Sequence, residues 1–497
     1  MNKFYSLTKQ NTAIIVVILI VLLSLSACTS HQIYRKDYSV CISGDPVQEC
    51  QKNALQQIVD PSNESISYML GFIEFDDQGQ LWDRKQMDSV LTRVNEEAGQ
   101  GEVLIVTFVH GWKHSAAPGD TNIETFRDSL HRLAELENRL ASVGDQPARK
   151  VIGVYLGWRG KSVSFPGLKE LTFWERKNTA HKVGHGGVTE VLSRLELVKS
   201  TKDAIVANEA VDKALQEALK IGQKNTDEVE LVLDKARKTK SKTRLVIVGH
   251  SFGGAVVFSA LSQIIEERFL ETQGPMGMLT NARSFGDLVV LINPAFEATR
   301  FSALSDMSTE RGSYFASQLP VLAVLTSEAD DATRRAFPIG RWLSTLFEKD
   351  HDVKRKNAVT RQEEEIDQGD ANITAVGHFD PYKTHFLKAK EEVDRESIAA
   401  PSLNEDIQGL LDVADQWKND APSSELGFYG STLQRTSTSA GRNPYLVVRV
   451  DEELIEDHND IDDPRIIAFI RQIILLASQG ETLDDNRKIL MKMVGEK

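Results

Sequence analysis

The sequence predicts an α/β fold with a mostly parallel sheet flanked by helices. Short, almost uninterrupted apolar runs recur along the chain, as expected of strands buried on both faces of a parallel sheet. Amphipathic stretches of helical period lie between them, which gives the strand–helix alternation that right-handed crossovers require. The runs that we interpret as strands are 103–109, 151–156, 245–248, 288–292, 321–325 and 445–450.

The remaining elements are placed around these strands. Residues 67–75, a turn at 76–79 and residues 80–82 predict a hairpin before the first run. Residues 122–140 and 464–478 predict amphipathic helices. Two intervals are too long for single crossovers, so we expect insertions at about 161–242 and 335–440 within one domain, 63–497. In the first insertion, a heptad-like apolar spacing predicts helices packed as a cap over the domain; it comprises Val206, Val211, Leu215 and Leu219.

Composition restricts the classes of function. The chain has 497 residues, of which 41% are hydrophobic and 26% charged, as in an ordinary globular protein. The net charge is −14, whereas a nucleic-acid partner would require a basic surface stripe. We therefore expect no nucleic-acid partner, and we expect neither a metal nor an organic cofactor.

The first 27 residues predict a signal peptide. Lys3 and Lys9 precede an apolar run at 13–23, which is too short to span a bilayer comfortably. Leu25-Ser26-Ala27-Cys28 follows directly and resembles the bacterial lipobox. The resemblance implies cleavage before Cys28 and lipidation of its thiol, and the Thr at position 29 implies delivery to the outer membrane, facing the periplasm or the exterior. A plain signal peptide and an uncleaved anchor are the alternatives.

Residues 28–62 are interpreted as a tether between this anchor and the domain. Cys41 and Cys50 lie nine residues apart in this stretch. Outside the cytoplasm the environment is oxidising, so we expect a local disulfide between them, with two free thiols as the alternative.

The sequence around Ser251 predicts a catalytic nucleophile. Gly249-His250-Ser251-Phe252-Gly253 follows the strand at 245–248 and opens an apolar helix. This is the setting that a G-x-S-x-G elbow requires, because only glycines leave room for so sharp a turn. The turn would hold the serine hydroxyl at the helix N-terminus, where the dipole favours a developing anion. The alternative is a tight β–α turn with a structural role alone.

Together with the strand that ends in Phe108-Val109-His110-Gly111-Trp112, this elbow resembles the α/β-hydrolase superfamily, and in particular its bacterial esterase- and lipase-like members. The resemblance covers about residues 66–490. It implies that the backbone N–H groups of Phe252 and Trp112 form the oxyanion hole. For His110 we expect a structural role in shaping the loop.

The same fold places the acid and then the histidine after the serine. Asp330 follows the fifth run and is our choice for the acid, with Asp331 in reserve. The base belongs between the last strand and the last helix, and His458 lies between 445–450 and 464–478. His385 and His378 are the alternatives.

These residues predict a serine hydrolase that cleaves carboxylic esters through an acyl-enzyme, with an acyl ester, and possibly a lipid, as substrate. The lipid anchor at Cys28 would tether it to a membrane. Amide or peptide hydrolysis is the second enzymatic reading. A catalytically inactive hydrolase fold that serves in binding or envelope assembly is the third.

Overall fold

The computed structural model describes residues 32–143, 147–160, 169–221, 226–338, 341, 349–390, 403–419, 425–459, 461 and 463–479. The predicted signal peptide and Cys28 lie outside the described residues. Among the residues described, no helix is long and apolar enough to cross a membrane.

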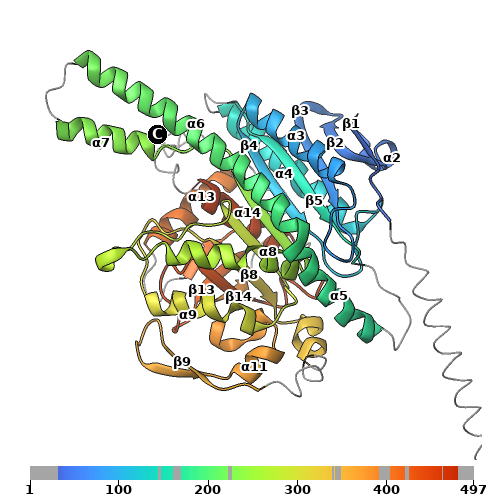
Figure 1. Cartoon of the computed structure of the whole chain (residues 1–497), viewed down its shortest axis with the longest axis vertical. Coiled ribbons are helices and arrows are strands. Elements are labelled where there is room, and N and C mark those ends of the chain that lie inside the picture. Colours follow the sequence, from blue (N-terminus) through green and yellow to red (C-terminus); the bar gives the residue numbers. More distant parts are fainter. Residues whose placement is uncertain are drawn as a thin grey trace, which may run out of the picture.

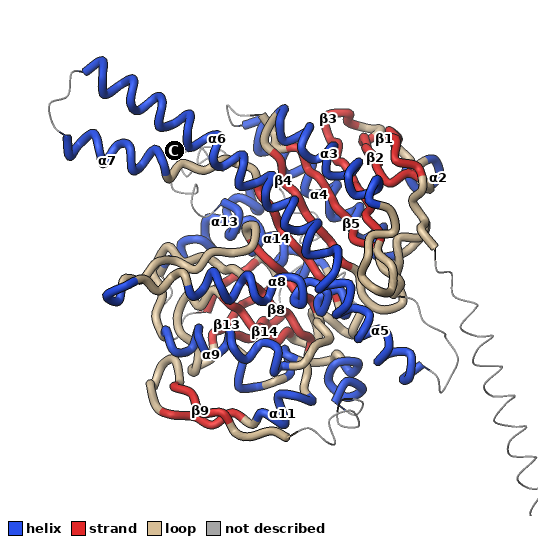
Figure 2. The backbone as a smooth tube through the Cα atoms, viewed as in Figure 1, coloured by secondary structure: helices blue, strands red, loops and turns tan. Residues whose placement is uncertain are grey.

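A twelve-stranded sheet organises the molecule, in the order β1-β2-β3-β5-β4-β6-β7-β8-β14-β11-β13-β12 (Figures 1 and 2). The eight strands from β3 to β11 in this order are parallel. The strands are β1 (Asp37–Ser43), β2 (Asn53–Asp60), β3 (Asn63–Glu74), β4 (Val103–Val109), β5 (Lys150–Gly157), β6 (Arg244–His250), β7 (Leu288–Ile292), β8 (Leu322–Ser327), β11 (His385–Ala389), β12 (Glu425–Phe428), β13 (Ser431–Arg435) and β14 (Tyr445–Val450).

Helices cover both faces of this sheet and enclose two apolar layers. One layer is covered by α3 (Arg84–Gln100), α5 (Lys169–Val183), α6 (Thr189–Ile221), α8 (Phe252–Leu270) and α9 (Ser302–Arg311). The other is covered by α4 (Thr121–Val143), α13 (Leu403–Lys418) and α14 (Pro464–Gln479). The smaller helices are α2 (Pro46–Glu49), α7 (Thr226–Arg237) and α11 (Gln368–Ile373). The predicted class, a mostly parallel sheet between helices, is confirmed.

The prediction that residues 28–62 form a tether is wrong for the part from residue 37 onwards. β1 pairs with β2, and β2 pairs antiparallel with β3, so both strands extend the main sheet. Cys41 and Cys50 are joined by a disulfide, which links β1 to the turn before β2. The sequence signal was weak because β1 lies at the sheet edge, where most of its side chains are exposed.

The second predicted insertion, 335–440, contributes three strands to the same sheet. β11 pairs with β14, and β13 and β12 follow as antiparallel neighbours. A separate two-stranded hairpin, β9 (Val353–Lys356) and β10 (Glu363–Ile366), lies beside α9. The strands escaped prediction because each has only four or five residues and its apolar positions are few.

The first insertion does not cap the domain as predicted. α7 ends at Arg237 and leads into the start of β6, so the helical pair of α6 and α7 projects from the amino ends of the strands (Figure 1). Ser251 lies at the opposite, carboxyl end of β6. Leu215 and Leu219, which were expected to pack, are exposed.

Candidate active site

Ser251 occupies the turn between β6 and α8 with a backbone φ of 56°. A positive φ is unfavourable for a residue with a side chain, so surrounding contacts must enforce it. The Ser251 N–H donates to the Ile292 carbonyl at 2.9 Å, and the Ser251 carbonyl accepts from the Ala295 N–H at 3.1 Å. The carboxyl end of the neighbouring strand β7 therefore fixes the turn.

The two glycines of the elbow are sterically required. A Cβ on Gly253 would lie 2.0 Å from the Val109 carbonyl oxygen, and a Cβ on Gly249 would lie 2.8 Å from the Gly253 oxygen. No real Cβ tolerates such contacts with backbone atoms. These contacts give the physical reason for the G-x-S-x-G spacing at this position.

Ser251, His458 and Asp330 form a hydrogen-bonded chain. His458 Nε2 lies 2.6 Å from Ser251 Oγ, and His458 Nδ1 lies 2.9 Å from Asp330 Oδ1. A proton on Nδ1 donates to the carboxylate, which leaves Nε2 to accept the serine proton. All three side chains are buried or nearly so, and Asp330 is fully buried.

The carboxyl ends of three parallel strands bring these residues together, although 207 positions separate Ser251 from His458. Ser251 follows β6, Asp330 follows β8 and His458 follows β14. The Thr333 N–H and hydroxyl both donate to the Asp330 carboxylate. Burial raises the pKa of Asp330, but the charge of His458 and these hydrogen bonds outweigh burial and hold that pKa below its usual value.

Two further side chains hold the backbone of His458. The His458 carbonyl oxygen accepts from His250 Nε2 at 3.0 Å and from Asn293 Nδ2 at 2.9 Å. Asn293 Oδ1 in turn accepts the Ser327 N–H at 3.0 Å. Burial, reinforced by the charge of His458, lowers the pKa of His250 to about 3, so this histidine remains a neutral donor. The sequence analysis did not single out His250 and Asn293. The available signal was their position, because His250 ends β6 and Asn293 follows the neighbouring strand β7.

The alternative residues lie elsewhere. His385 opens β11, where its Nδ1 contacts the Thr384 hydroxyl. His378 Nε2 lies 2.9 Å from Thr333 Oγ1, which places it behind the acid rather than beside Ser251. Asp331 is exposed and pairs with Arg335. The structure thus brings together the first-choice residues and none of these alternatives.

The loop after β4 lies against the serine. A Cβ on Gly111 would be 2.6 Å from Ser251 Cβ, so this loop passes directly beside Ser251. Trp112 follows Gly111, and Phe252 is the first residue of α8. His110 is buried: its Nε2 accepts the Trp158 N–H at 3.0 Å, and its Nδ1 contacts the Gly111 carbonyl. These contacts give His110 the structural role that we expected.

Aromatic side chains wall the site on the side of α5. The ring of Phe173 lies 4.8 Å from that of Phe252 and 5.6 Å from that of Trp112. Behind it, Trp174 packs against Phe337 at 5.6 Å. An aromatic cluster therefore lies next to Phe252, the residue that follows Ser251.

A buried ion pair fixes α5 to the core. Lys177, on α5, bonds Glu297, and both side chains are almost fully buried. Arg300 and Arg341 also pair with Glu297. Burial lowers the pKa of Lys177 to about 8, whereas the charge of Lys177 helps to lower the pKa of Glu297 to about 2 despite its burial.

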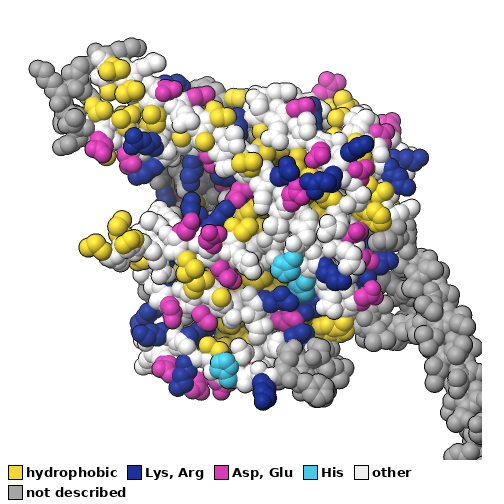
Figure 3. Space-filling model, in the orientation of Figure 1, with side chains coloured by type: hydrophobic (Ala, Val, Ile, Leu, Met, Phe, Trp, Pro, Cys, Tyr) yellow, Lys and Arg dark blue, Asp and Glu magenta, His cyan; other side chains and the backbone are white. Residues whose placement is uncertain are grey.

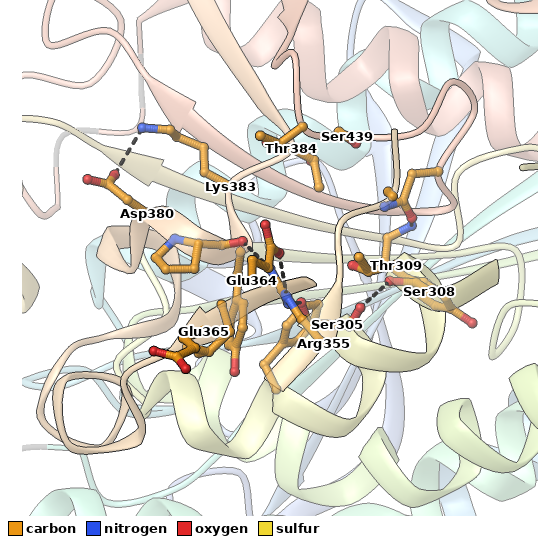
Figure 4. A pocket seen from close by; sticks show the side chains of 18 residues that line it. Ser305, Ser308, Thr309, Arg355, Glu364, Glu365, Asp380, Lys383, Thr384 and Ser439 are labelled. Carbon is orange, nitrogen blue, oxygen red and sulfur yellow. Dashed lines mark hydrogen bonds and ion pairs between the residues drawn. The ribbon is translucent and has the colours of Figure 1, made fainter. Parts of the chain in front are cut away.

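Two other cavities lie away from the triad. One, of about 230 Å³, is lined by polar groups that pair with one another: Arg355 with Glu364 at 2.8 Å, and Lys383 with Asp380 at 2.9 Å (Figure 4). The other, of about 680 Å³, is a groove of mixed charge beneath α6, seen as a hollow in Figure 3. No triad residue lines either cavity, so neither is the site built around Ser251.

Residues 207–364 match the model of a family described as "Alpha/beta hydrolase of unknown function (DUF900)". This segment contains both Ser251 and Asp330. None of the curated proteins compared with the chain matches it. The order of the sheet, the elbow and the family match over this segment are consistent with the α/β-hydrolase fold.

Among solved structures, one that matches is phospholipase PlaB from Legionella pneumophila in complex with thio-NAD. The identity is 12%, and the match covers 79% of this chain and 62% of that chain, with a TM-score of 0.22. The chain thus spans less than two thirds of the length of that protein. A similarity at this level carries no conclusion about fold or activity.

Proposed function

We propose that this hydrolase cleaves carboxylic esters, with Ser251 as nucleophile, His458 as base and Asp330 as the acid that orients it. The observation that carries the proposal is the chain of two hydrogen bonds, 2.6 Å and 2.9 Å long, that joins the three side chains. A serine alone is a weak nucleophile at neutral pH, and this arrangement supplies the adjacent base that activates it.

The proposed reaction has two halves. Ser251 Oγ attacks the ester carbonyl while His458 Nε2 takes its proton, and the backbone N–H groups of Phe252 and Trp112 stabilise the oxyanion. His458 then returns the proton to the leaving alcohol, which departs and leaves an acyl-enzyme. Water, activated by the same histidine, hydrolyses that ester and frees Ser251. These steps use only protein groups and water.

The apolar wall around Ser251 supports an acyl substrate. The rings of Phe173 and Trp112 are partly buried and belong to the same aromatic cluster as Phe252, the residue that follows Ser251, and apolar contact is what binds an acyl chain. The lipobox-like Leu25–Cys28 supports the second part of the proposal, a lipid anchor that tethers the enzyme to the bacterial envelope.

Hydrolysis of p-nitrophenyl butyrate by the purified protein tests the activity. Ser251→Ala should abolish turnover. Asp330→Asn should lower kcat by about 10⁴-fold, because His458 is then no longer held in the tautomer with its proton on Nδ1. Ser200→Ala, an exposed serine on α6, is the matched control and should retain the wild-type rate. Cleavage of a p-nitroanilide in preference to the ester would favour an amidase. An inert wild type would favour the binding role.

A further inference from the structure

The start of the described chain is locked to the edge of the sheet that carries Ser251. β1 and β2 are parallel to each other and antiparallel to β3, whereas β3 runs in the same direction as β6. Strands that run in opposite directions begin and end at opposite edges. The first residue of β1, Asp37, therefore lies at the edge where β3 and β6 end.

A buried cluster holds the residues just before β1 in place; we call it the N-terminal clamp, and it consists of Tyr34, Arg35, Glu74 and Gln86. The Glu74 carboxylate accepts the N–H groups of Tyr34 at 2.9 Å and Arg35 at 2.8 Å. Gln86 Nε2 donates to Glu74 Oε1 at 3.1 Å and to the Arg35 carbonyl at 2.9 Å. These contacts fix the positions of Tyr34 and Arg35 and therefore the start of β1.

The Arg35 side chain ties this point to the loop beside the nucleophile. Its Nε donates to the Ala116 carbonyl at 2.9 Å, and its guanidinium lies 4.2 Å from the centre of the Phe72 ring. Arg35 and Glu74 are both almost completely buried, which is costly for charged groups unless their hydrogen bonds are satisfied. Here Glu74 has three donors, and the cluster holds the chain at this place.

The clamp lies close to Ser251 across the sheet. Glu74 ends β3, one residue beyond a row of paired residues that crosses four adjacent strands: Ile73, Leu156, Val109 and Gly249. Three strand spacings of about 4.8 Å separate the ends of this row, or roughly 14 Å. Ser251 follows Gly249 by two residues, so the clamp and the nucleophile share one edge of the sheet.

Cys28 precedes Tyr34 by six residues (34 − 28). A fully extended chain of that length spans at most about 22 Å. A lipid on Cys28 would therefore lie no further than that from the clamp. This reach is about the length of one strand, since the seven residues of β4 span roughly 23 Å. A lipid on Cys28 therefore cannot pass far beyond the amino edge of the sheet, and an anchor there favours an orientation in which the carboxyl edge, with Ser251, faces the membrane.

The rim of the site suits such a surface. Trp112 is partly exposed next to the serine loop, and the Lys113 ammonium lies 4.7 Å from the centre of its ring. Tryptophan and lysine are both favoured at the boundary between lipid headgroups and acyl chains.

We infer that the substrate is an acyl ester of a membrane lipid, taken from the bilayer to which the enzyme is anchored, because the N-terminal clamp and the short Cys28 tether hold the Ser251 edge against that bilayer. This inference rests on the proposed ester hydrolysis at Ser251. It adds the class of substrate and the direction from which it arrives.

The test uses the full-length lipidated protein incorporated in vesicles of phosphatidylethanolamine and phosphatidylglycerol. Fatty-acid release from the vesicle lipids is measured by mass spectrometry, and hydrolysis of p-nitrophenyl butyrate is measured on the same sample. In one variant, 30 Gly/Ser residues are inserted after Ser30, upstream of the clamp. In its control, the same segment follows Lys497.

The longer tether lowers the effective concentration of the site at the membrane, roughly as the −3/2 power of tether length. We expect fatty-acid release to fall about tenfold in the Ser30 insertion and to stay at the wild-type rate in the Lys497 control. Cys28→Ser should reduce fatty-acid release by at least the same factor as the Ser30 insertion. All variants should hydrolyse p-nitrophenyl butyrate at the wild-type rate, because none of them alters the site.

Fatty-acid release that is unaffected by the tether, or absent from the wild type, would overturn the inference while ester hydrolysis stands. Failure of Cys28 to carry lipid would overturn it as well. If the wild type hydrolyses neither substrate, the proposed function itself fails.

Discussion

His250 donates a hydrogen bond from Nε2 to the backbone carbonyl oxygen of His458, across 3.0 Å. His250, which precedes Ser251 in sequence, thereby fixes the backbone of His458, 208 positions away. Asn293 donates to the same oxygen. Two neighbouring strand ends thus set the distance between Ser251 Oγ and the imidazole, and His250 acts as a positioning residue through His458.

Removal of this donor should slow the reaction without weakening substrate binding. We expect His250→Phe to lower kcat about tenfold, equivalent to about 1.4 kcal/mol or one hydrogen bond, and to change KM less than twofold. We expect kcat to fall and KM to stay nearly constant because the imidazole of His458 shifts while the residues that bind the acyl group do not. Steady-state kinetics with p-nitrophenyl butyrate measure both constants. His131→Phe, a partly exposed histidine on α4, is the control, and an equal loss of kcat in both variants would refute the positioning role.

Gly111→Ala should reduce activity without unfolding the protein. Its new Cβ would lie 2.6 Å from Ser251 Cβ and 2.9 Å from the His250 carbonyl oxygen, so the loop or the elbow must move. A displacement of this size costs about 10²-fold in kcat. In the control Gly99→Ala, in α3, the new Cβ has no atom within 4 Å, so both activity and stability should stay at the wild-type level. Kinetics and thermal unfolding distinguish the two, and a fully active Gly111→Ala would show that the loop does not confine the serine.

The Lys177–Glu297 pair should contribute strongly to stability. Glu297→Gln leaves Lys177 buried without its carboxylate, which should cost about 3 kcal/mol in the free energy of unfolding. Guanidinium unfolding at pH 7.5 measures this loss. Glu271→Gln, which breaks an exposed pair with Arg283, should cost less than about 1 kcal/mol. Equal losses in the two variants would mean that α5 is not held by the buried pair.

Acid should destabilise the fold through its buried neutral histidines. Burial lowers the pKa of His385 to about 3, whereas an unfolded histidine titrates near 6.5. Between these two values the unfolded state binds the extra proton, so stability must fall as pH decreases from about 6.5 toward 3. One such histidine contributes about 1.4 kcal/mol per pH unit.

Guanidinium unfolding at pH 7, 6, 5 and 4 gives the slope of stability against pH. We expect His385→Gln to reduce this slope by about 1 kcal/mol per pH unit, whatever its effect on stability at pH 7. His110, His181, His250 and His378 should contribute to the remainder, since burial lowers the pKa of each, and below about pH 5 carboxylates with lowered pKa such as Glu297 add to it. An identical slope in the variant would show that His385 is protonated in the folded state.

The central strands and the sharp turn at Ser251 were predictable because local sequence largely determines them. Strands buried on both faces leave continuous apolar runs, and the glycines around Ser251 form a recognisable local pattern, although Gly253 is required by the distant Val109 carbonyl as well as by the turn itself. The proximity of Asp330 and His458 to Ser251 was predictable from order along the chain, because in a parallel sheet the carboxyl ends of strands share an edge.

The parts of the fold that were not predicted depend on contacts between residues that are distant in sequence. β1 is mostly exposed, so its polar sequence resembled a tether, and its place became evident only from its pairing with β2. Similarly, Glu74 and Arg35 appear as ordinary charged residues until the fold buries them together. The spacing at 206–219 predicted packing, but it cannot indicate at which end of the sheet α6 lies.

The most direct test of the central claim is labelling of the purified protein by a fluorophosphonate probe, which reacts with a serine only when an adjacent base activates it. We predict stoichiometric labelling of the wild type on Ser251, located by peptide mass spectrometry. We also predict loss of labelling in Ser251→Ala and labelling slowed by several orders of magnitude in His458→Ala. Absence of labelling in the folded wild type, or equal labelling of wild type and Ser251→Ala, would contradict the account.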